Sequence, residues 1–320
     1  FSRKDLLMKR ILSLDGGGIK GVFSASFLAC IEDSINDKVS NYFDLIAGSS
    51  TGGIIALGLG LGFSAKEILT FYEKLGPQIF IGNSIFNTIR HLFFSKYTSK
   101  ELKLALESQF GSKTLGESDK RLVIPAMNLE TGEIYIYKTS HNPRFERDHK
   151  EKVVDVALAT AAAPSYFAPH MSQSGLPLID GGVWANNPMG MAVVEAIGNL
   201  NWPSNSLRVL SIGCTSEALS VGVGRKVGLG VGYWGTKAVE IFMASQSSSS
   251  LGTAQVLIGH KNVFRINPIV ARGRFALDTI QEIPSLKGLG ASEARKALPH
   301  ICPIFFKTQA KPFKPNHGAD

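Results

Sequence analysis

The chain has 320 residues, of which 44% are hydrophobic and 19% are charged, so it is long enough to bury a sizeable core and is not disordered. Its formal net charge of +8 favours an anionic partner: a phospholipid surface, a nucleotide or a nucleic acid. Nucleic acid is the weakest of these, because no zinc-finger spacing, RRM-like aromatic motif or run of Lys and Arg occurs. Three widely spaced cysteines without a C-x-x-C pair argue against a disulfide framework or zinc site and suit a reducing cytoplasm.

No apolar run approaches the roughly 18 residues needed to span a bilayer, and the first ten residues have too short an apolar core for a secretory signal. We therefore expect a cytoplasmic protein. The sequence also has no internal repeat and no linker between independent cores. This predicts one domain over residues 1–320, with a motif-bearing core at 9–266 and a C-terminal extension at 267–320.

The first predicted element is a short buried strand at residues 9–14, which leads directly into the motif Asp15–Gly21. Three consecutive glycines between a strand and a helix leave backbone N–H groups able to point together at one anion. This predicts either a phosphate loop or an oxyanion hole. Because the Walker and dinucleotide-binding patterns are absent, we favour an oxyanion hole formed by Gly16, Gly17 and Gly18.

A second buried strand, at residues 42–47, precedes the segment Gly48–Gly53, and a helical pattern follows from Ile54. Gly48-Ser49-Ser50-Thr51-Gly52 fits the G-x-S-x-G nucleophile elbow, in which a strained turn exposes one serine hydroxyl at a helix N-terminus. The central residue, Ser50, is therefore the predicted nucleophile.

Further along, the sequence predicts helices at 64–80 and 99–110 and strands at 121–128 and 133–138. Between the two helices, apolar residues recur at helical spacing with cations beside them. Such a stripe usually packs into a core, but a basic amphipathic helix also rests on membrane interfaces. We therefore take Phe86, Ile89 and Phe93 as candidates for the rim of a lipid entrance.

An alanine-rich helix is predicted over residues 155–167, and alanine permits the close backbone approach expected of a helix lying against the elbow. A short strand at 176–179 then leads into Asp180-Gly181-Gly182. An Asp-Gly pair is by itself most often only a turn. Here Asp180 supplies the base that Ser50 requires.

The C-terminal third predicts a strand at 207–213, a mobile glycine-rich loop at 219–235, a helix at 236–250, a strand at 262–266, a helix at 291–298 and a frayed tail from Lys311. Between Ile241 and Leu277 no acidic residue occurs, and Lys261, Arg265, Arg272 and Arg274 supply four cations. Such a segment is most often a solvated face, and the alternative is an anion site. Strands alternating with helices throughout the chain predict an α/β domain with a largely parallel sheet and active-site residues beyond the strand ends.

Four motifs occur in order, at Asp15–Gly21, Gly48–Gly53, Ala163–Phe167 and Asp180–Gly182, and together they resemble those of the patatin-like phospholipases. The resemblance covers roughly residues 9–266. It implies a three-layer α/β/α fold and a Ser-Asp dyad that cleaves lipid esters at a membrane surface without a cofactor or metal. In this match Ser50 is the nucleophile, Asp180 its partner, and Gly16, Gly17 and Gly18 the oxyanion loop. Lys20 stands where many bacterial members have Arg.

Within that family, the compact build and the acid-free basic segment look similar to the CapV-type effectors of the CBASS antiphage system. Those are phospholipases that a cyclic dinucleotide such as cGAMP switches on after phage infection. The resemblance implies a cyclic dinucleotide as a partner of this chain, a homo-oligomer, and peripheral association with the inner face of the membrane when active. Arg265, Arg272 and Arg274 are the predicted contacts of the nucleotide.

Three alternatives remain open at this stage. A constitutive lipid acyl hydrolase needs no activator. A Ser-His-Asp hydrolase would follow the chain order Ser, Asp, His, which favours His260 or His300, although neither lies in a glycine-rich loop. A non-catalytic module would use the loop of Gly16 to Gly18 only to bind an anion or nucleotide.

Overall fold

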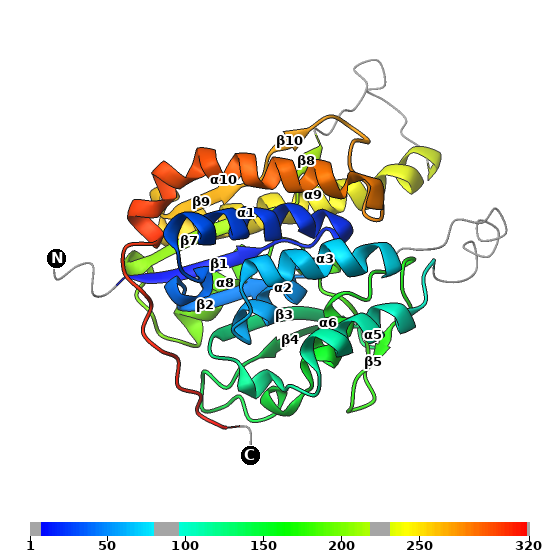
Figure 1. The fold of residues 1–320 in the computed structure, drawn as a ribbon. Helices are drawn as coiled ribbons and strands as arrows, with labels where there is room; N and C mark the ends of the chain where they lie inside the picture. Colours follow the sequence, from blue (N-terminus) through cyan, green and yellow to red (C-terminus); the bar gives the residue numbers. More distant parts are fainter. Residues whose placement is uncertain (1–7, 80–95, 218–230, 319–320) are drawn as a thin grey trace.

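The computed structural model describes residues 8–79, 96–217 and 231–318, and a single large sheet lies at its centre (Figure 1). Its strands are β1 (Lys9–Leu14), β2 (Leu45–Gly48), β3 (Arg121–Asn128), β4 (Ile134–Lys138), β5 (His170–Met171), β6 (Pro177–Asp180), β7 (Leu207–Ile212) and β9 (Val263–Ile266). They follow the order β5-β6-β3-β2-β1-β7-β9, with β4 also paired to β3. A separate two-stranded sheet contains β8 (Ser216–Glu217) and β10 (Ile269–Val270).

The centre of the large sheet is parallel. β1 pairs in parallel with β2 and β7, β2 with β3, and β7 with β9, whereas β4, β5 and β6 join in antiparallel pairs. The carboxyl ends of β1 and β2 therefore meet at one end of the sheet, where the Asp15–Gly21 motif and the elbow begin. The predicted α/β domain with a largely parallel sheet is confirmed.

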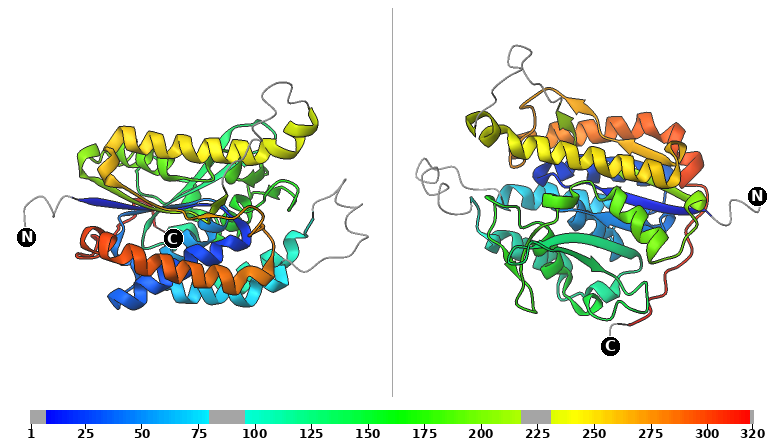
Figure 2. Two further views of the ribbon diagram at one scale, coloured as in Figure 1. Left: turned by 90° about the horizontal axis from the view of Figure 1, so that it is seen from above. Right: turned by 180° about the vertical axis from the view of Figure 1, so that it is seen from behind.

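Helices cover both faces of this sheet. They are α1 (Gly21–Ile35), α2 (Thr51–Gly60), α3 (Ala65–Ile79), α5 (Ser99–Phe110), α6 (Val153–Thr160), α7 (Gly182–Ala185), α8 (Met189–Gly198), α9 (Val231–Ile258) and α10 (Ile283–Phe305). Figure 2 shows α8 and α9 on one face and α1, α3 and α10 on the other, which gives the expected three layers. No helix of the described ranges is both long and apolar enough to cross a lipid bilayer.

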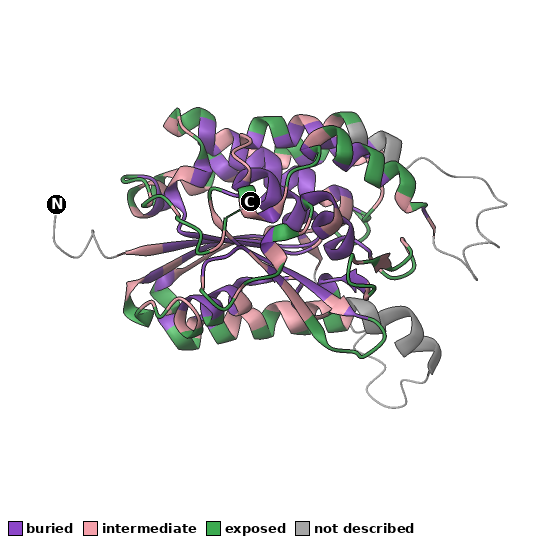
Figure 3. Ribbon diagram, turned by 90° about the horizontal axis from the view of Figure 1, so that it is seen from below, coloured by how far each residue is buried: buried purple, intermediate pink, exposed green. Residues whose placement is uncertain are grey.

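Burial on both faces explains why the central strands are almost continuously apolar in sequence. Ile11 of β1 packs with Ala192 of α8 and Ala254 of α9, in the core beneath those helices. Its neighbours Leu12 and Leu14 belong to the other core, which lies beneath α1, α2 and α10. Figure 3 shows the resulting buried strands between helices whose outward surfaces are exposed.

The pairing of β3 brings the ends of β2 and β6 together. Val123 pairs with a residue of β2 on one side and with Lys138 of β4 on the other. Farther along the strand, Ala126 pairs with Asp180 of β6 and again with a residue of β4. Since β4 occupies one edge of β3 throughout, β2 and β6 share the opposite edge. The antiparallel β6 thus ends beside the carboxyl end of β2, and Asp180 lies next to the elbow.

The last helix corrects a prediction, because α10 runs from Ile283 to Phe305 and not from 291 to 298. A Cβ on Gly290 would lie 2.4 Å from the carbonyl oxygen of Phe23 in α1, so this glycine permits close helix packing and does not end the helix. Pro299 and Pro303 lie inside α10, where the burial of the flanking Ile301 and Phe305 offsets the lost backbone hydrogen bonds.

Two further predictions in the C-terminal third are also wrong. α9 continues past the four serines at 247–250 to Ile258, and it begins at Val231, inside the predicted loop, of which residues 219–230 lie outside the described ranges. The tail is not frayed as far as residue 318. The backbone N–H groups of Asn316 and His317 donate to the carbonyl and hydroxyl oxygens of Ser140, each at 2.7 Å. α8 had no counterpart in the sequence analysis.

Candidate active site

The segment Gly48–Gly52 forms a sharp strand-to-helix turn. Ser50 occupies the position just before α2 and has a φ of 54°, which is rare for a residue with a side chain. The glycines are required by space: a Cβ on Gly48 would lie 2.1 Å from the carbonyl oxygen of Gly52, and one on Gly52 would lie 2.3 Å from that of Leu14. The strained turn therefore presents the Ser50 side chain at the carboxyl end of β2.

Thr160, the last residue of α6, holds this turn in place. Its hydroxyl accepts a hydrogen bond from the Ser50 N–H at 3.1 Å and donates one to the carbonyl oxygen of Pro125 at 2.6 Å. Its own carbonyl accepts the N–H of Gly181. One buried residue thus contacts the backbone on both sides of the site. Thr160 was missed in the sequence, where its only signal is a polar residue inside an alanine-rich helix.

The Ser50 hydroxyl donates a hydrogen bond to Oδ2 of Asp180 at 2.6 Å. Oδ1 of Asp180 accepts the backbone N–H of Gly182, also at 2.6 Å. Asp180 is only 3% exposed, and this burial raises the pKa of its carboxyl group to about 6, although the bonds from Ser50 and Gly182 oppose the rise. A carboxylate with such a pKa is a stronger base than an ordinary aspartate.

The other candidate nucleophiles and bases do not share this arrangement. Ser49 is fully buried, and its hydroxyl has no hydrogen-bond partner in the described part of the chain. His260 and His300 are exposed, and neither forms a described hydrogen bond with Ser50 or Asp180. Of the predicted nucleophiles and bases, the structure therefore brings together Ser50 and Asp180.

The glycine loop, Gly16 to Gly18, lies beside the elbow. A Cβ on Gly16 would lie 3.0 Å from the Cβ of Ser50. The Gly16 N–H already donates to the carbonyl oxygen of Asn186 at 3.0 Å, and the Ile19 N–H donates to that of Leu277 at 2.8 Å. Within the described ranges, no acceptor is found for the N–H groups of Gly17 and Gly18. These two N–H groups are the ones available to a substrate oxygen.

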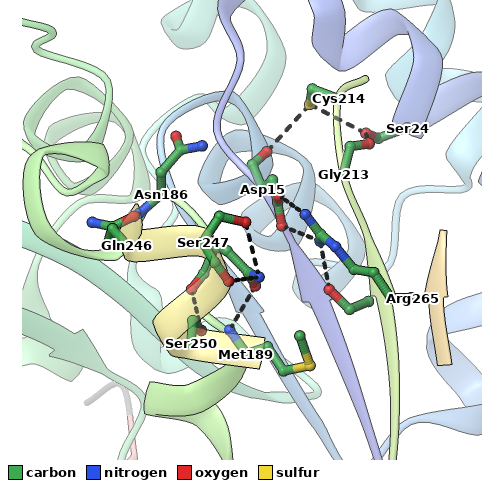
Figure 4. A network of polar contacts seen from close by, with 12 residues as sticks. Asp15, Ser24, Asn186, Met189, Gly213, Cys214, Gln246, Ser247, Ser250 and Arg265 are labelled. Carbon is green, nitrogen blue, oxygen red and sulfur yellow. Dashed lines mark hydrogen bonds and ion pairs between the residues drawn. The ribbon is translucent and has the colours of Figure 1, made fainter. Parts of the chain in front are cut away.

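Helix α9 positions Asn186, whose carbonyl oxygen accepts the Gly16 N–H (Figure 4). Oε1 of Gln246 accepts the Asn186 N–H at 2.7 Å. One turn farther along α9, the Ser250 hydroxyl donates to the carbonyl oxygen of Asn187 at 2.7 Å and accepts the N–H of Gly190 at 2.8 Å. The serine-rich part of α9 thus fixes the segment that follows Asp180, which explains why the helix continues through it.

The three predicted effector arginines differ in exposure and in partners. Arg265 of β9 is turned inward, where its guanidinium binds both carboxylate oxygens of Asp15 (Figure 4). Arg272 and Arg274 are exposed and follow β10, and the guanidinium of Arg274 lies 5.3 Å from the centre of the Phe275 ring. Of the three, Arg265 is therefore the mostly buried one, and it is already paired with a carboxylate.

The candidate rim residues Phe86, Ile89 and Phe93 lie outside the described residues. The described ranges contain no group of three or more His, Cys, Asp or Glu side chains arranged to hold a metal ion.

Comparison with known proteins identifies relatives of this site and fold. A family model described as patatin-like phospholipase matches residues 12–193, which include all four motifs. A cGAMP-activated phospholipase of Pseudomonas aeruginosa is 34% identical over 297 residues, which cover 90% of this chain and 88% of that protein. A protein of the same name from Vibrio cholerae is 36% identical over 271 residues, covering 78% of this chain and 76% of its relative.

Among solved structures, VipD from Legionella pneumophila aligns with a TM-score of 0.51. The alignment covers 92% of this chain and 67% of VipD, at 16% sequence identity. This likeness concerns the fold alone.

Proposed function

This chain belongs to the patatin-like phospholipase family and is a lipid acyl hydrolase, and from that premise we propose that Ser50 and Asp180 form its catalytic dyad. The observation that carries the proposal is the 2.6 Å hydrogen bond from the Ser50 hydroxyl to a buried carboxylate whose pKa is raised to about 6. No other base is needed to activate the serine.

The reaction proceeds in two steps. Asp180 takes the proton of Ser50, and the serine oxygen attacks the ester carbonyl of a phospholipid acyl chain. The Gly17 and Gly18 N–H groups stabilise the oxyanion that forms, while the Gly16 N–H, bound to Asn186, fixes the loop. The tetrahedral intermediate collapses, and the lysolipid oxygen leaves with the proton held by Asp180. Water, deprotonated by Asp180, then hydrolyses the acyl-enzyme and regenerates Ser50.

Labelling and substitution test the dyad. Wild-type protein should react with a fluorophosphonate at Ser50, which a non-catalytic anion-binding module would not do. Ser50→Ala and Asp180→Asn should each lower kcat on a soluble ester by about 10³-fold or more, and the double variant should lose little beyond that because the pair acts as a unit. Ser49→Ala is the matched control and should retain most activity. An active Ser50→Ala with an inactive Ser49→Ala would mean that the register of the elbow is wrong.

The rival Ser-His-Asp mechanism is tested by His260→Ala and His300→Ala. We expect both variants to keep the activity of the wild-type protein, since both side chains are exposed and neither forms a described hydrogen bond with Ser50 or Asp180. A loss of about 10³-fold in either would transfer the role of base from Asp180 to that histidine.

A second proposal concerns regulation by a cyclic dinucleotide such as cGAMP, and it rests on the names of the two bacterial relatives. The exposed Arg272 and Arg274 can contact two phosphates through charge-assisted hydrogen bonds. Three residues beyond Arg274, the carbonyl oxygen of Leu277 accepts the Ile19 N–H at the end of the glycine loop. A nucleotide bound to the arginines would thus act on the segment that contacts the oxyanion site.

The resemblance to the CapV-type effectors leads us to propose further that an activated form degrades the membrane of its own cell in antiphage defence, acting peripherally on anionic lipid as a cytoplasmic enzyme. Hydrolysis of phospholipid vesicles with and without a panel of cyclic dinucleotides tests this. Arg272→Glu combined with Arg274→Glu should abolish the increase in activity that the nucleotide produces, each protein being compared with itself without nucleotide. Lys311→Glu combined with Lys314→Glu, on the exposed tail, makes the same change in net charge and should keep the increase. Full activity without any nucleotide, or no binding at micromolar concentration, would leave a constitutive phospholipase.

A further inference from the structure

The most buried pair of opposite charges near the active site joins Asp15 to Arg265. One guanidinium nitrogen of Arg265 donates to Oδ1 of Asp15 at 2.7 Å and to the Ser211 hydroxyl at 2.7 Å, and the other donates to Oδ2 of Asp15. The side chains of Arg265 and Asp15 are 15% and 5% exposed. This two-pronged contact between a guanidinium and a carboxylate fixes direction as well as distance.

The ion pair connects β9 with the residue that follows β1, where the glycine loop begins. Arg265 lies beside Ser211 of β7, and Ser211 lies beside Ser13 of β1, so the arginine side chain reaches across β7 to the residue that follows β1. Asp15 is the residue immediately before Gly16. Its backbone is held as well, because its N–H donates to the carbonyl oxygen of Ile212 at 3.0 Å. The first residue of the loop is thus bound through backbone and side chain together.

The charge of the pair matters as much as its geometry. An unpaired carboxylate directly before the glycine loop would oppose the negative charge that develops on a substrate oxygen there. Burial raises the pKa of Asp15, and the positive charge of Arg265 opposes that rise. Arg265 therefore allows a buried aspartate to hold the loop without adding net negative charge to the site.

We propose that Arg265 is a positioning residue of the hydrolase, which acts through Asp15 to fix and electrostatically balance the N–H groups of Gly17 and Gly18. This inference rests on the proposed dyad and oxyanion loop. It gives Arg265 a task within catalysis in place of nucleotide binding. The guanidinium of Arg265 is engaged by Asp15 and Ser211. If it acts through the loop, its loss should reduce kcat and leave KM nearly unchanged, because the oxyanion N–H groups bind the transition state more strongly than the ground state.

Three full-length variants test the proposal: Arg265→Met, Arg265→Lys and, as a matched control, Lys138→Met. Lys138 forms a comparably buried ion pair with Glu195, at 2.7 Å, and pairs with Val123 near the amino end of β3. The measurements are kcat and KM on a soluble short-chain ester, at a temperature at which every variant is folded, and the rate of fluorophosphonate labelling of Ser50.

Arg265→Met should lower kcat and the labelling rate by about 10–10²-fold, approaching the loss seen when one oxyanion donor is removed. KM should change by less than about threefold. Arg265→Lys keeps the positive charge but cannot bind both carboxylate oxygens of Asp15 at once, so its kcat should lie between those of the Met variant and wild type. Lys138→Met should lower Tm while its kcat stays within about twofold of wild type.

A folded Arg265→Met with wild-type kcat would overturn the inference, as would an equal loss of kcat in Lys138→Met, which would mark both pairs as purely structural. If Arg265→Met does not fold, Arg265→Lys decides the matter, and unchanged kcat in that variant would also overturn it. An inactive, unlabelled wild-type protein is a different result, because it would remove the proposed dyad itself.

Discussion

Two buried carboxyl groups near opposite ends of the sheet have opposite surroundings. Asp180, beside the carboxyl ends of the parallel strands, accepts hydrogen bonds from Ser50 and Gly182, and burial raises its pKa to about 6. Glu195 of α8 contacts Lys138 and His141, and Lys138 pairs with Val123 near the amino end of β3. Burial acts to raise the pKa of Glu195 as well, but the bonds from these partners and the charge of Lys138 outweigh it, so the pKa is lowered.

The difference separates catalysis from stability. Glu195 has a cationic partner, so ionising it favours the folded state. Asp180 is buried and hydrogen-bonded only by neutral groups, so its ionised form is unfavourable in the folded state. The raised pKa that results makes the carboxylate a better base. Two buried threonines repeat the contrast: Thr160 accepts the N–H of the strained Ser50, whereas Thr139 accepts the N–H of Leu122 at 2.9 Å, in regular β3. The same residue type thus supports the strained turn in one place and a regular strand in the other.

The largest effect that separates the two ends is the pH dependence of hydrolysis. Asp180 must be ionised to accept the proton of Ser50, so kcat/KM on a soluble ester should fall about tenfold per pH unit below about 6. Circular dichroism should confirm that the protein stays folded over the range measured. Glu195→Gln should leave the midpoint unchanged. A midpoint near 4 would show that Asp180 keeps the pKa of an ordinary aspartate and would contradict the comparison.

The threonines give the next effect. Thr160→Val keeps the shape of the side chain but leaves the Ser50 N–H without its acceptor, so the elbow should relax and kcat should fall about tenfold. Thr139→Val removes an equivalent bond at the other end. Both variants should lose about 1–2 kcal/mol of unfolding free energy, and only the first should lose activity. Equal kcat losses in the two variants would mean that general destabilisation, and not the position of Ser50, sets the rate.

Much of the catalytic end could be predicted because its requirements are local. The strand at 9–14, the turn at Gly48–Gly53 and the aspartate that ends the strand before Gly181 each follow from a short apolar run and the glycines beside it. Each of these motifs directly follows a predicted strand, which distinguishes it from a glycine-rich linker. Local chemistry of this kind is visible in sequence.

The C-terminal third was predicted less well because its residues act through distant partners. In the sequence, Gly290 and Ser250 suggest helix ends. In the structure, Gly290 packs against α1, and Ser250 bonds the segment that follows Asp180. Arg265 suggests a member of a surface cluster, because nothing in the sequence pairs it with Asp15, 250 residues earlier. Such pairings arise from the order of strands in the sheet, which periodicity does not specify.

The smallest effect is on stability, and its sign should differ between the two carboxyls. A raised pKa in the folded state means that ionised Asp180 destabilises the fold at pH values above about 6. In Asp180→Asn the amide oxygen can accept the Gly182 N–H and the amide nitrogen can donate to the Ser50 oxygen, so the substitution should raise the unfolding free energy at pH 7.5 by about 1–3 kcal/mol. A lowered pKa means that ionised Glu195 stabilises the fold above its unfolded pKa, so Glu195→Gln should lower the free energy by about 2 kcal/mol. Denaturant titrations measure both. The gain in Asp180→Asn should disappear as the pH falls from 6 towards 4, where the wild-type carboxyl becomes protonated. Destabilisation by both substitutions at pH 7.5 would mean that Asp180 is held by the fold as firmly as Glu195, and the division between the two ends of the sheet would be wrong.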